Sequence, residues 1–412
     1  MENSFLKEFK EREYYNQCTN EIELENIMGS SKIKAYIGFD CTAQSLHVGS
    51  LLQIMCLRLL QKFGHQPIVL LGGGTTRIGD PSGKEETRKI LSEKEIEKNI
   101  KNIQNVFKIF LKTKNPKTKP IFVNNFKWLG KLNYIRFLRD IGKHFTINKM
   151  LSFDSVKLRL DREQSLSYME FNYMILQAYD FLELSKTKKC ILQIGGSDQW
   201  GNIINGVDLI KRHSSKSVYG LTTPLITLAS GAKMGKTEKG AIWLDKKLLS
   251  PFDYWQFWRN TDDRDVIKFL KMFTDLDLKE INKISNNDIN SLKIILANEA
   301  TKMLHGKDAA LRAQKTAKNI FEKGSIGDDL KSVEIKIKLI EDGINIIDLV
   351  NFTDLFVSKS EIRRAIQNKG LKLNNITIDD EKLIVSKDQL DNKNYFKLSH
   401  GKKKHILLKF TN

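Results

Sequence analysis

Strand-like and helix-like segments alternate through the first half of the chain, and this alternation restricts the possible fold more than any other feature. Apolar segments at Lys34–Asp40, Pro67–Gly72 and Ile191–Gly195 are typical of buried strands. Between the first two, Val48–Phe63 carries apolar residues at helical spacing and stops at Gly64. This order predicts an α/β fold in which crossover helices connect the strands of a parallel sheet.

Later segments follow different patterns. A helix is predicted at Ser167–Leu184, opened by a capping box from Ser167 to Glu170. The pattern is helical throughout 250–321, and from about 344 it changes to a short helix followed by strand-like segments. We therefore expect a Rossmann-like parallel-sheet core with a connecting insertion at 1–222, a linker at 223–248, an all-helical domain at 249–325 and a small α+β domain at 344–412.

The charge balance favours a polyanionic partner. The 412 residues include 68 Lys and Arg against 49 Asp and Glu, a formal net charge of +19. Cationic side chains that neutralise phosphates release counterions, which favours nucleic-acid binding. A lysine-rich compositional bias explains the surplus about as well.

The remaining composition predicts an intracellular enzyme without a bound metal. The four cysteines form no CxxC pair, and His400 and His405 have no cysteine or acidic cluster beside them, so we expect no metal site. The amino terminus has no signal-like apolar stretch, and no apolar run is long enough to span a bilayer. These features predict a cytoplasmic protein with no membrane association.

Two short motifs could handle phosphate. His47-Val48-Gly49-Ser50 follows a predicted strand and opens a helix, whose free amides and dipole favour an anion. Lys233-Met234-Gly235-Lys236-Thr237 places two lysines in a loop, where they could neutralise charge on a transferring phosphate. Taken singly, a helix cap and a solvated basic loop are the better interpretations.

Three further segments place polar groups near the carboxyl ends of strands. Gly72–Lys84 fails the P-loop spacing but brings Asp80 to the sheet edge, where ligands bind in parallel sheets. Gly195–Asn202 offers Asp198 to ribose hydroxyls, or to a helix cap. On the predicted helix, three polar residues spaced by four and then three positions share one face, namely Tyr173, Gln177 and Asp180. Such a face suits either a small polar ligand or an internal hydrogen-bond network.

Together and in this order, these elements resemble one family, the bacterial-type tyrosyl-tRNA synthetases. HVGS resembles the family's HIGH motif and KMGKT its KMSKS motif. The segments YIGFDCTAQSLHVGS, GGGTTRIGDPSGK, NYMILQAYDF and LQIGGSDQWGN resemble its core blocks and are more specific than the two short motifs. The resemblance runs from about Tyr36 to the end of the chain.

The resemblance implies a role for each matching residue. The substrate phenol would bind Tyr36 and Asp180. The amino acid's ammonium and carboxylate would bind Asp80, Tyr173, Gln177 and Gln199. ATP would lie along Gly38, Asp40, Gly49, Ser50, Gly196, Asp198 and Lys236. Pyrophosphate would be stabilised by Thr42, His47, Lys233 and Lys236, assisted by Lys84 and Arg88.

The chemistry agrees with these roles. The tyrosine carboxylate attacks the α-phosphorus of ATP, and because it is already ionised the step needs no general base. Magnesium would arrive with ATP, without a protein metal site. One position departs from the family, since Ser50 stands where HIGH has its second histidine. Its hydroxyl has a shorter reach toward the ribose.

The end of the chain resembles the small RNA-binding domain named after a ribosomal small-subunit protein. A capping box from Ser358 to Glu361 opens a short helix. The candidate phosphate-binding residues on or after it are Lys359, Arg363, Arg364, Lys402, Lys403 and Lys404. In isolation, a solvated charged helix is the better interpretation, but its place at the end of a synthetase-like chain favours RNA.

The resemblance implies a homodimeric enzyme that acts on L-tyrosine, ATP and the tRNA for tyrosine. It also implies that the linker at 223–248 carries the KMSKS-like loop and that the helical domain recognises tRNA. A tryptophanyl-tRNA synthetase should lack the polar helix face in this form. An alternative from another functional class is an RNA-binding protein derived from a synthetase scaffold. This alternative predicts that the phosphate-binding motifs are damaged. Ser50 keeps that alternative open, although the other motif residues are present.

Overall fold

A computed structural model describes residues 4–81, 91–237, 240–323, 332–390, 395–401 and 404–411, with the backbone alone described at 154, 155, 158, 236, 237, 320–323 and 404. The chain divides into two compact units. The first consists of Met1–Leu249 and Phe257–Leu304, and the second of Ser250–Gln256 and His305–Asn412.

The first unit is built on a six-stranded sheet with the order β1-β6-β5-β2-β3-β4. Five of these strands are parallel, and only β1 runs antiparallel to its neighbour. The strands are β1 (Gln17–Cys18), β2 (Lys34–Phe39), β3 (Gln66–Leu71), β4 (Ile121–Asn124), β5 (Cys190–Gly196) and β6 (Tyr219–Thr223). The predicted α/β fold and its three central strands are therefore confirmed.

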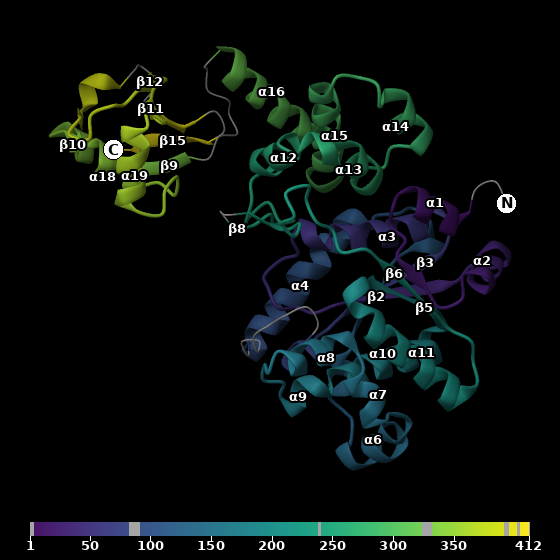
Figure 1. Ribbon diagram of the computed structural model, residues 1–412. Helices are drawn as coiled ribbons and strands as arrows, with labels where there is room; N and C mark the ends of the chain where they lie inside the picture. The colour runs from purple at the N-terminus through teal and green to yellow at the C-terminus, as the bar shows by residue number, and fades with distance from the viewer. Residues whose placement is uncertain are drawn as a thin grey trace. The chain divides into compact units, whose positions relative to one another are not determined.

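Helices cover both faces of this sheet, with α3 on one side and α10 and α11 on the other (Figure 1). Apart from the short helices of an insertion, the described part of Met1–Leu249 contains six α-helices. They are α1 (Phe5–Glu11), α2 (Glu21–Ser30), α3 (Leu51–Lys62), α4 (Glu93–Phe110), α10 (Tyr173–Lys188) and α11 (Trp200–Ser214). Almost all apolar side chains of α3 are buried, because the helix lies between the sheet and neighbouring helices. A single turn of 3₁₀ helix, Val48–Ser50, precedes it.

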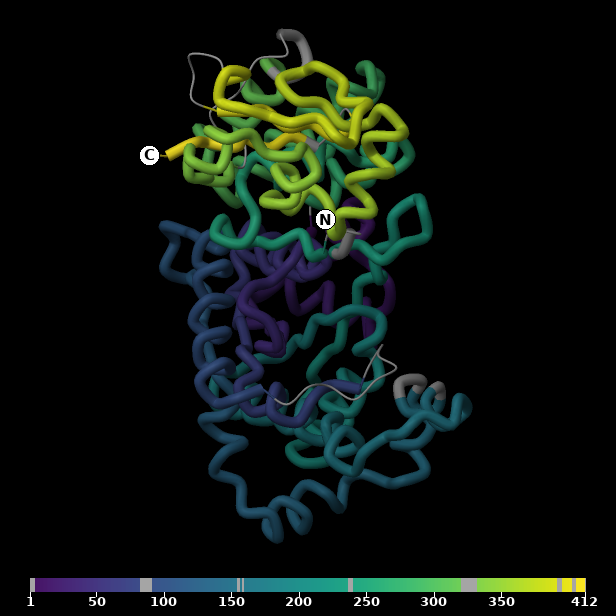
Figure 2. The backbone as a smooth tube through the Cα atoms, turned by 90° about the vertical axis from the view of Figure 1, so that its left-hand side faces the viewer, coloured from purple at the N-terminus to yellow at the C-terminus, as the bar shows by residue number. Residues whose placement is uncertain are grey.

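An insertion of short helices connects β4 to α10 and lies at one end of the first unit (Figures 1 and 2). It comprises α5 (Phe126–Leu129), α6 (Tyr134–Asp140), α7 (Ile147–Leu151), α8 (Asp154–Asp161) and α9 (Tyr168–Phe171). The predicted helix at Ser167–Leu184 is present, but it is divided into two helices. The capping box of Ser167 and Glu170 is present and opens α9, and a single residue, Asn172, separates α9 from α10, which runs on to Lys188.

The chain after β6 contains two short strands, which were not predicted, and then the run of helices that its pattern predicted. The strands are β7 (Lys236–Thr237) and β8 (Gly240–Ala241). The helices are α12 (Pro251–Arg259), α13 (Val266–Phe273), α14 (Leu278–Ile284), α15 (Ile289–His305) and α16 (Lys307–Lys323). Aromatic rings fill the core of this helical portion, with Trp258 in contact with Phe269 and Phe273.

The second unit contains a five-stranded sheet with the order β12-β11-β14-β15-β9 and a separate pair, β10 and β13. Its strands are β9 (Ser332–Lys336), β10 (Ile344–Asn345), β11 (Leu371–Leu373), β12 (Ile376–Thr377), β13 (Ile384–Val385), β14 (Tyr395–His400) and β15 (Lys404–Thr411). Helices α17 (Lys338–Glu341), α18 (Ile346–Asn351) and α19 (Lys359–Gln367) accompany them. Because β9 pairs in parallel with β15, this sheet begins before residue 344, the expected domain boundary.

Candidate active site

A cavity of about 360 Å³ opens at the carboxyl ends of β2 and β5, within the size range of small-molecule sites. The edge formed by the carboxyl ends of parallel strands is where ligands bind in open α/β sheets. Most of the residues singled out in the sequence line it, namely Tyr36, Gly38, Asp40, Thr42, Gly49, Ser50, Asp80, Tyr173, Gln177, Asp180, Gly196, Asp198 and Gln199.

A buried polar cluster forms one end of the cavity. The Asp180 carboxylate, on α10, accepts hydrogen bonds from the Asn125 side-chain amide at 2.8 Å and from the Trp128 indole N–H at 2.7 Å. Asn125 is fully buried and its carbonyl oxygen accepts from the Gly74 amide at 2.6 Å, so it ties the glycine-rich turn after β3 to α10. Tyr36, on β2, is also buried, but its hydroxyl has no hydrogen-bond partner among the described residues.

Burial sets the ionisation of these two side chains. It raises the pKa of Asp180 to about 7, against the opposing effect of the hydrogen bonds from Asn125 and Trp128. Burial, followed by the nearby Asp180 charge, raises the pKa of Tyr36 well above its ordinary value. Tyr36 therefore stays a neutral phenol that can donate a hydrogen bond, and Asp180 is an acceptor whose strength depends on pH.

Hydrogen bonds from two side chains, those of Thr75 and Tyr173, hold Asp40 at the end of β2. Thr75 donates to one carboxylate oxygen at 2.7 Å and Tyr173 donates to the other at 3.1 Å. Gly72 makes room for this arrangement, because a Cβ there would lie 2.3 Å from the Asp40 carboxylate. Tyr173, one of the three residues predicted to share a polar helix face, thus joins α10 to the end of the strand that carries Tyr36.

Two acidic side chains, Asp80 and Asp198, face the cavity from the turns after β3 and β5. The Gln199 side-chain amide donates to Asp80 at 2.9 Å and lies 3.4 Å from Asp198. Burial raises the pKa of Asp198, and the Asp80 charge adds to the effect while Gln199 and Lys233 oppose it. A Cβ on Gly196 would lie 2.5 Å from the Asp198 carboxylate, so the glycine fixes where this carboxylate can sit. The two acids can hold a cation or accept from hydroxyl groups.

The two short motifs lie against each other. The Gly49 amide donates to Nδ1 of His47 at 3.0 Å, and Val48 and Leu244 make backbone hydrogen bonds that join the motif to residues just after β8. Gly235 has φ +123°, and a Cβ there would lie 2.7 Å from Nδ1 of His47. The lysine-containing loop can therefore approach His47 only because residue 235 has no side chain.

Several residues predicted for the site are not among those that line the cavity. His47 lies against Gly49 and Gly235 instead. Lys233 is exposed but close enough to lower the pKa of Asp198. Lys84 and Arg88 lie outside the described residues, as does the side chain of Lys236.

Sequence reasoning missed several residues around the cavity. Asn125 and Trp128 support Asp180 from the start of the insertion, and the only signal in the sequence was a polar pair that directly follows the apolar segment of β4. Gln53, on α3, and Gln193, on β5, also line the cavity. Gln193 lies opposite Tyr36 in the register of β2 and β5.

The carboxy-terminal helix carries the predicted basic residues on an exposed surface. Ser358 accepts from the Glu361 amide, but Glu361 accepts from the Val357 amide rather than from Ser358, so the predicted capping box is only half formed. Lys359 pairs with Asp348 at 2.6 Å. Arg363 and Arg364 lie on α19. Lys402 and Lys403 lie outside the described residues, and of Lys404 only the backbone is described.

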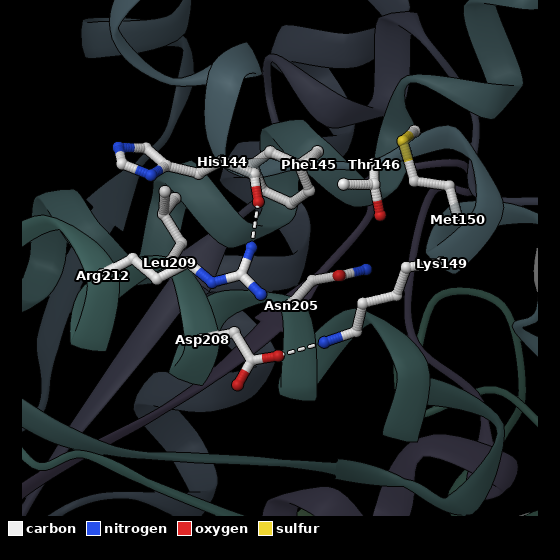
Figure 3. A pocket seen from close by; sticks show the side chains of 9 residues that line it. All are labelled: His144, Phe145, Thr146, Lys149, Met150, Asn205, Asp208, Leu209 and Arg212. Carbon is white, nitrogen blue, oxygen red and sulfur yellow. Dashed lines mark hydrogen bonds and ion pairs between the residues drawn. The ribbon is translucent and has the colours of Figure 1, made fainter.

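A smaller hollow between α7 and α11 does not qualify as a substrate site. Its volume of about 10 Å³ holds one water molecule at most. Figure 3 shows that Lys149 pairs with Asp208 across it and that Arg212 donates to the backbone carbonyl of His144.

Among the described residues, no group of three or more His, Cys, Asp or Glu side chains could hold a metal ion. In the same part of the chain, no helix is long and apolar enough to cross a membrane.

Comparisons with known proteins agree with one another. The family described as tRNA synthetases class I (W and Y) matches residues 28–322. The tyrosine–tRNA ligase of Pelagibacter ubique is 69% identical over 404 residues, covering 98% of both chains, and that of Rickettsia felis is 51% identical over 409 residues, covering 98% of this chain and all of the relative. A C-terminally truncated mitochondrial tyrosyl-tRNA synthetase from Aspergillus nidulans superposes with a TM-score of 0.70 at 31% identity, covering 77% of this chain and 94% of that one.

Proposed function

Since this chain belongs to the class I tRNA synthetases of tryptophan and tyrosine, we infer that the cavity at its sheet edge is the site of tyrosine activation. The chain catalyses the ligation of tyrosine to tRNA. It activates L-tyrosine with ATP to tyrosyl-adenylate and pyrophosphate, and then transfers tyrosine to the terminal adenosine of its tRNA.

The observation that carries the choice of tyrosine is the pair Tyr36 and Asp180. Both are buried at one end of the cavity, and the Tyr36 hydroxyl lacks a hydrogen-bond partner among the described residues. A substrate phenol can accept from Tyr36 and donate to Asp180. Phenylalanine would leave the buried Tyr36 hydroxyl unpaired and would offer no donor to Asp180, which would keep only its hydrogen bonds from Asn125 and Trp128. The loss of these two contacts disfavours phenylalanine.

The rest of the cavity suits the other groups of the amino acid and of ATP. Asp80 with Tyr173 and Gln177 takes the α-ammonium, and Gln199 lies close to the carboxylate. Asp198, fixed beside Gly196, accepts from the ribose hydroxyls. Gly38 and Gly49 leave room for the nucleotide, which also runs past Asp40.

The activation step needs charge stabilisation rather than a base. The tyrosine carboxylate attacks the α-phosphorus in line, and pyrophosphate leaves. Thr42 and His47 with Lys233 and Lys236 stabilise the leaving group, and Lys84 and Arg88 assist them. Mg²⁺ enters as the complex with ATP, because this ion prefers phosphate oxygens and water to a dedicated protein site.

The parts of the chain after the core bind tRNA. The helical portion, placed at 249–325, recognises the tRNA, and the carboxy-terminal domain at 344–412 binds its backbone through Lys359, Arg363, Arg364, Lys402, Lys403 and Lys404. The exposed position of α19 and the net charge of +19 support this assignment. The similarity to tyrosine–tRNA ligases of bacteria supports a cytoplasmic location.

The enzyme is a homodimer. The insertion exposes large apolar side chains from several neighbouring helices, with Ile135 69% and Tyr168 67% exposed. They also include Tyr134, Leu138, Ile147, Leu151 and Leu160. Exposed apolar residues gathered on one region favour burial against a second copy.

An exchange assay tests this function. Labelled pyrophosphate should exchange into ATP when tyrosine is added, and not when phenylalanine or tryptophan replaces it. Exchange with tyrosine alone supports the phenol site. A folded chain that binds RNA but exchanges with no amino acid would contradict the function and favour the RNA-binding alternative, which the full-length similarity to tyrosine–tRNA ligases does not favour.

A further inference from the structure

The side chain of Asp265, in the helical portion of the first unit, is bonded to a loop of the catalytic core. Asp265 occupies the N-cap position of α13 and is 6% exposed. An aspartate at this position usually accepts from the first amides of its own helix, but the Asp265 side chain makes no capping bond. It accepts instead from the backbone amide of Ala229 at 2.7 Å. Because the acceptor is a carboxylate, this bond is stronger than one between two neutral groups.

Ala229 lies at the tip of a hairpin, residues 226–234, that carries one of the two motif lysines. Backbone hydrogen bonds of 2.8 and 3.0 Å join the two arms of this hairpin. Between them, Thr227 pairs with Lys233 in an antiparallel bridge. The position of Lys233 is therefore set by the position of the hairpin as a whole.

The hairpin is held at both ends. At its base, the next residue is Gly235, which lies against His47 of the HVGS motif. At its tip, the backbone amide is bonded to Asp265. Lys233 lies between these two anchors, exposed and close enough to Asp198 to lower the pKa of that carboxyl. Without the anchor at the tip, only the base would hold the hairpin, and the Lys233 ammonium would no longer have a fixed position.

We propose that Asp265 is a positioning residue for the activation step, because its carboxylate fixes the hairpin that holds Lys233 beside the leaving pyrophosphate. Stabilisation of charge depends on position, and a displacement of about 1 Å is enough to reduce the rate strongly. Asp265 is not among the residues that line the cavity, so it acts through the hairpin and not on the substrate. The inference rests on the proposed function, since Lys233 acts in the same reaction.

The first test compares two substitutions of Asp265. Asp265→Ala removes the acceptor, whereas Asp265→Asn keeps an oxygen that can accept from the Ala229 amide but carries no charge. In tyrosine-dependent pyrophosphate exchange, Asp265→Ala should lower kcat about ten-fold and leave KM for tyrosine within about two-fold of the wild-type value. Asp265→Asn should recover most of the loss and stay within about three-fold of the wild-type kcat.

A second test follows the hairpin without the reaction. Lys233 is exposed, and the rate at which trypsin cleaves after it, measured by mass spectrometry of a limited digest, reports how often the hairpin leaves its place. Asp265→Ala should raise this rate about ten-fold, the size of one hydrogen bond to a charged group. In the wild-type chain the Ala229 amide should be protected from hydrogen exchange, and an unprotected amide would contradict the bond without any variant.

Asp263→Ala is the matched control. Asp263 lies two residues earlier in the same 3₁₀ turn, but its carboxylate pairs with Lys293 and not with the hairpin. It should keep the wild-type kcat and cleavage rate. Equal losses in Asp263→Ala and Asp265→Ala would indicate a general weakening of the helical portion and would overturn the proposal, as would an Asp265→Ala chain with wild-type kcat and cleavage rate. Failure of the wild-type chain to exchange with tyrosine would instead overturn the proposed function, while the cleavage rates would still test the bond.

Discussion

At the scale of single residues, Asp180 links recognition to pH. Burial raises its pKa to about 7, and the hydrogen bonds from Asn125 and Trp128 are not enough to bring it down to that of an exposed carboxyl. The carboxylate form is the stronger acceptor for a phenol hydroxyl. Protonation of Asp180 should therefore weaken the proposed contact with the substrate phenol.

We expect KM for tyrosine to rise as pH falls from 8 to 6. With a pKa of about 7, the ionised fraction of Asp180 falls about ten-fold over that range, so KM should rise by up to about ten-fold. Pyrophosphate exchange measured at several pH values checks this. In Asp180→Asn, which carries no titrating group there, the same dependence should be lost. A variant that keeps the wild-type profile would assign the titration to another group.

Gly235 is the second residue with a direct functional consequence. Gly235→Ala should lower kcat for exchange by about ten-fold or more, because its Cβ would lie 2.7 Å from Nδ1 of His47 and push the lysine loop away. Binding of tyrosine, measured by equilibrium dialysis, should not change.

The variant Gly231→Ala is the control that distinguishes a steric clash with His47 from strain of a backbone with positive φ. Gly231 has φ +83° in the same loop, but a Cβ there would meet nothing within 4 Å. It should therefore keep most of its activity. Equal losses in the two variants would show that left-handed backbone, not the approach to His47, accounts for the effect.

At the scale of helices and strands, sequence patterns predicted the elements whose formation depends on local interactions. The strands β2, β3 and β5 and the helix α3 were predicted because apolar periodicity and glycine stops are local signals. The break at Asn172 was not predicted, since a polar residue between two apolar segments is compatible with a continuous helix. Asn125 and Trp128 were missed because their partner, Asp180, is more than 50 residues away, and only the folded sheet brings them together.

The amino-terminal helix shows another such long-range contact. Arg12 is buried, pairs with Glu8 at 2.7 Å, and donates to the carbonyl oxygens of Lys271, Thr274 and Leu276 just where α13 ends. It thereby satisfies carbonyl groups that a helix end leaves without partners. The helix α1 is in this way fastened to α13.

We expect Arg12→Ala to lower the free energy of unfolding by about 3 kcal/mol, because it leaves a buried carboxylate and several carbonyl groups with fewer partners. Urea denaturation followed by fluorescence measures the loss. Lys10→Ala is the comparison on the same helix: Lys10 pairs with Glu21 at the surface, where an ion pair contributes less than about 1 kcal/mol. Similar midpoints for the two variants would contradict a stabilising role for Arg12.

At the scale of the whole molecule, the surplus of cations should act on tRNA and not on the small substrates. Raising potassium chloride from about 50 to about 200 mM should raise KM for tRNA by about ten-fold or more, whereas KM for tyrosine in the exchange reaction should change less than about two-fold. Arg363→Ala combined with Arg364→Ala should reduce the salt dependence of KM for tRNA. If KM for tRNA and KM for tyrosine depended on salt to the same extent, the result would contradict a role of the positive charge in binding RNA.

The helix α3 has a mechanical consequence for the molecule. Its first turn adjoins the HVGS motif, and its far end is tied by Arg58 and Lys62 to Asp275 and Asp277, beyond α13. Twelve residues make a rod of about 18 Å, so a tilt of about 3° about one end moves the other by about 1 Å. A shift of that size is enough to misalign reacting groups. The ion pairs at the far end of α3 therefore help to fix the position of the HVGS motif beside the cavity, although they lie more than one helical turn away from it.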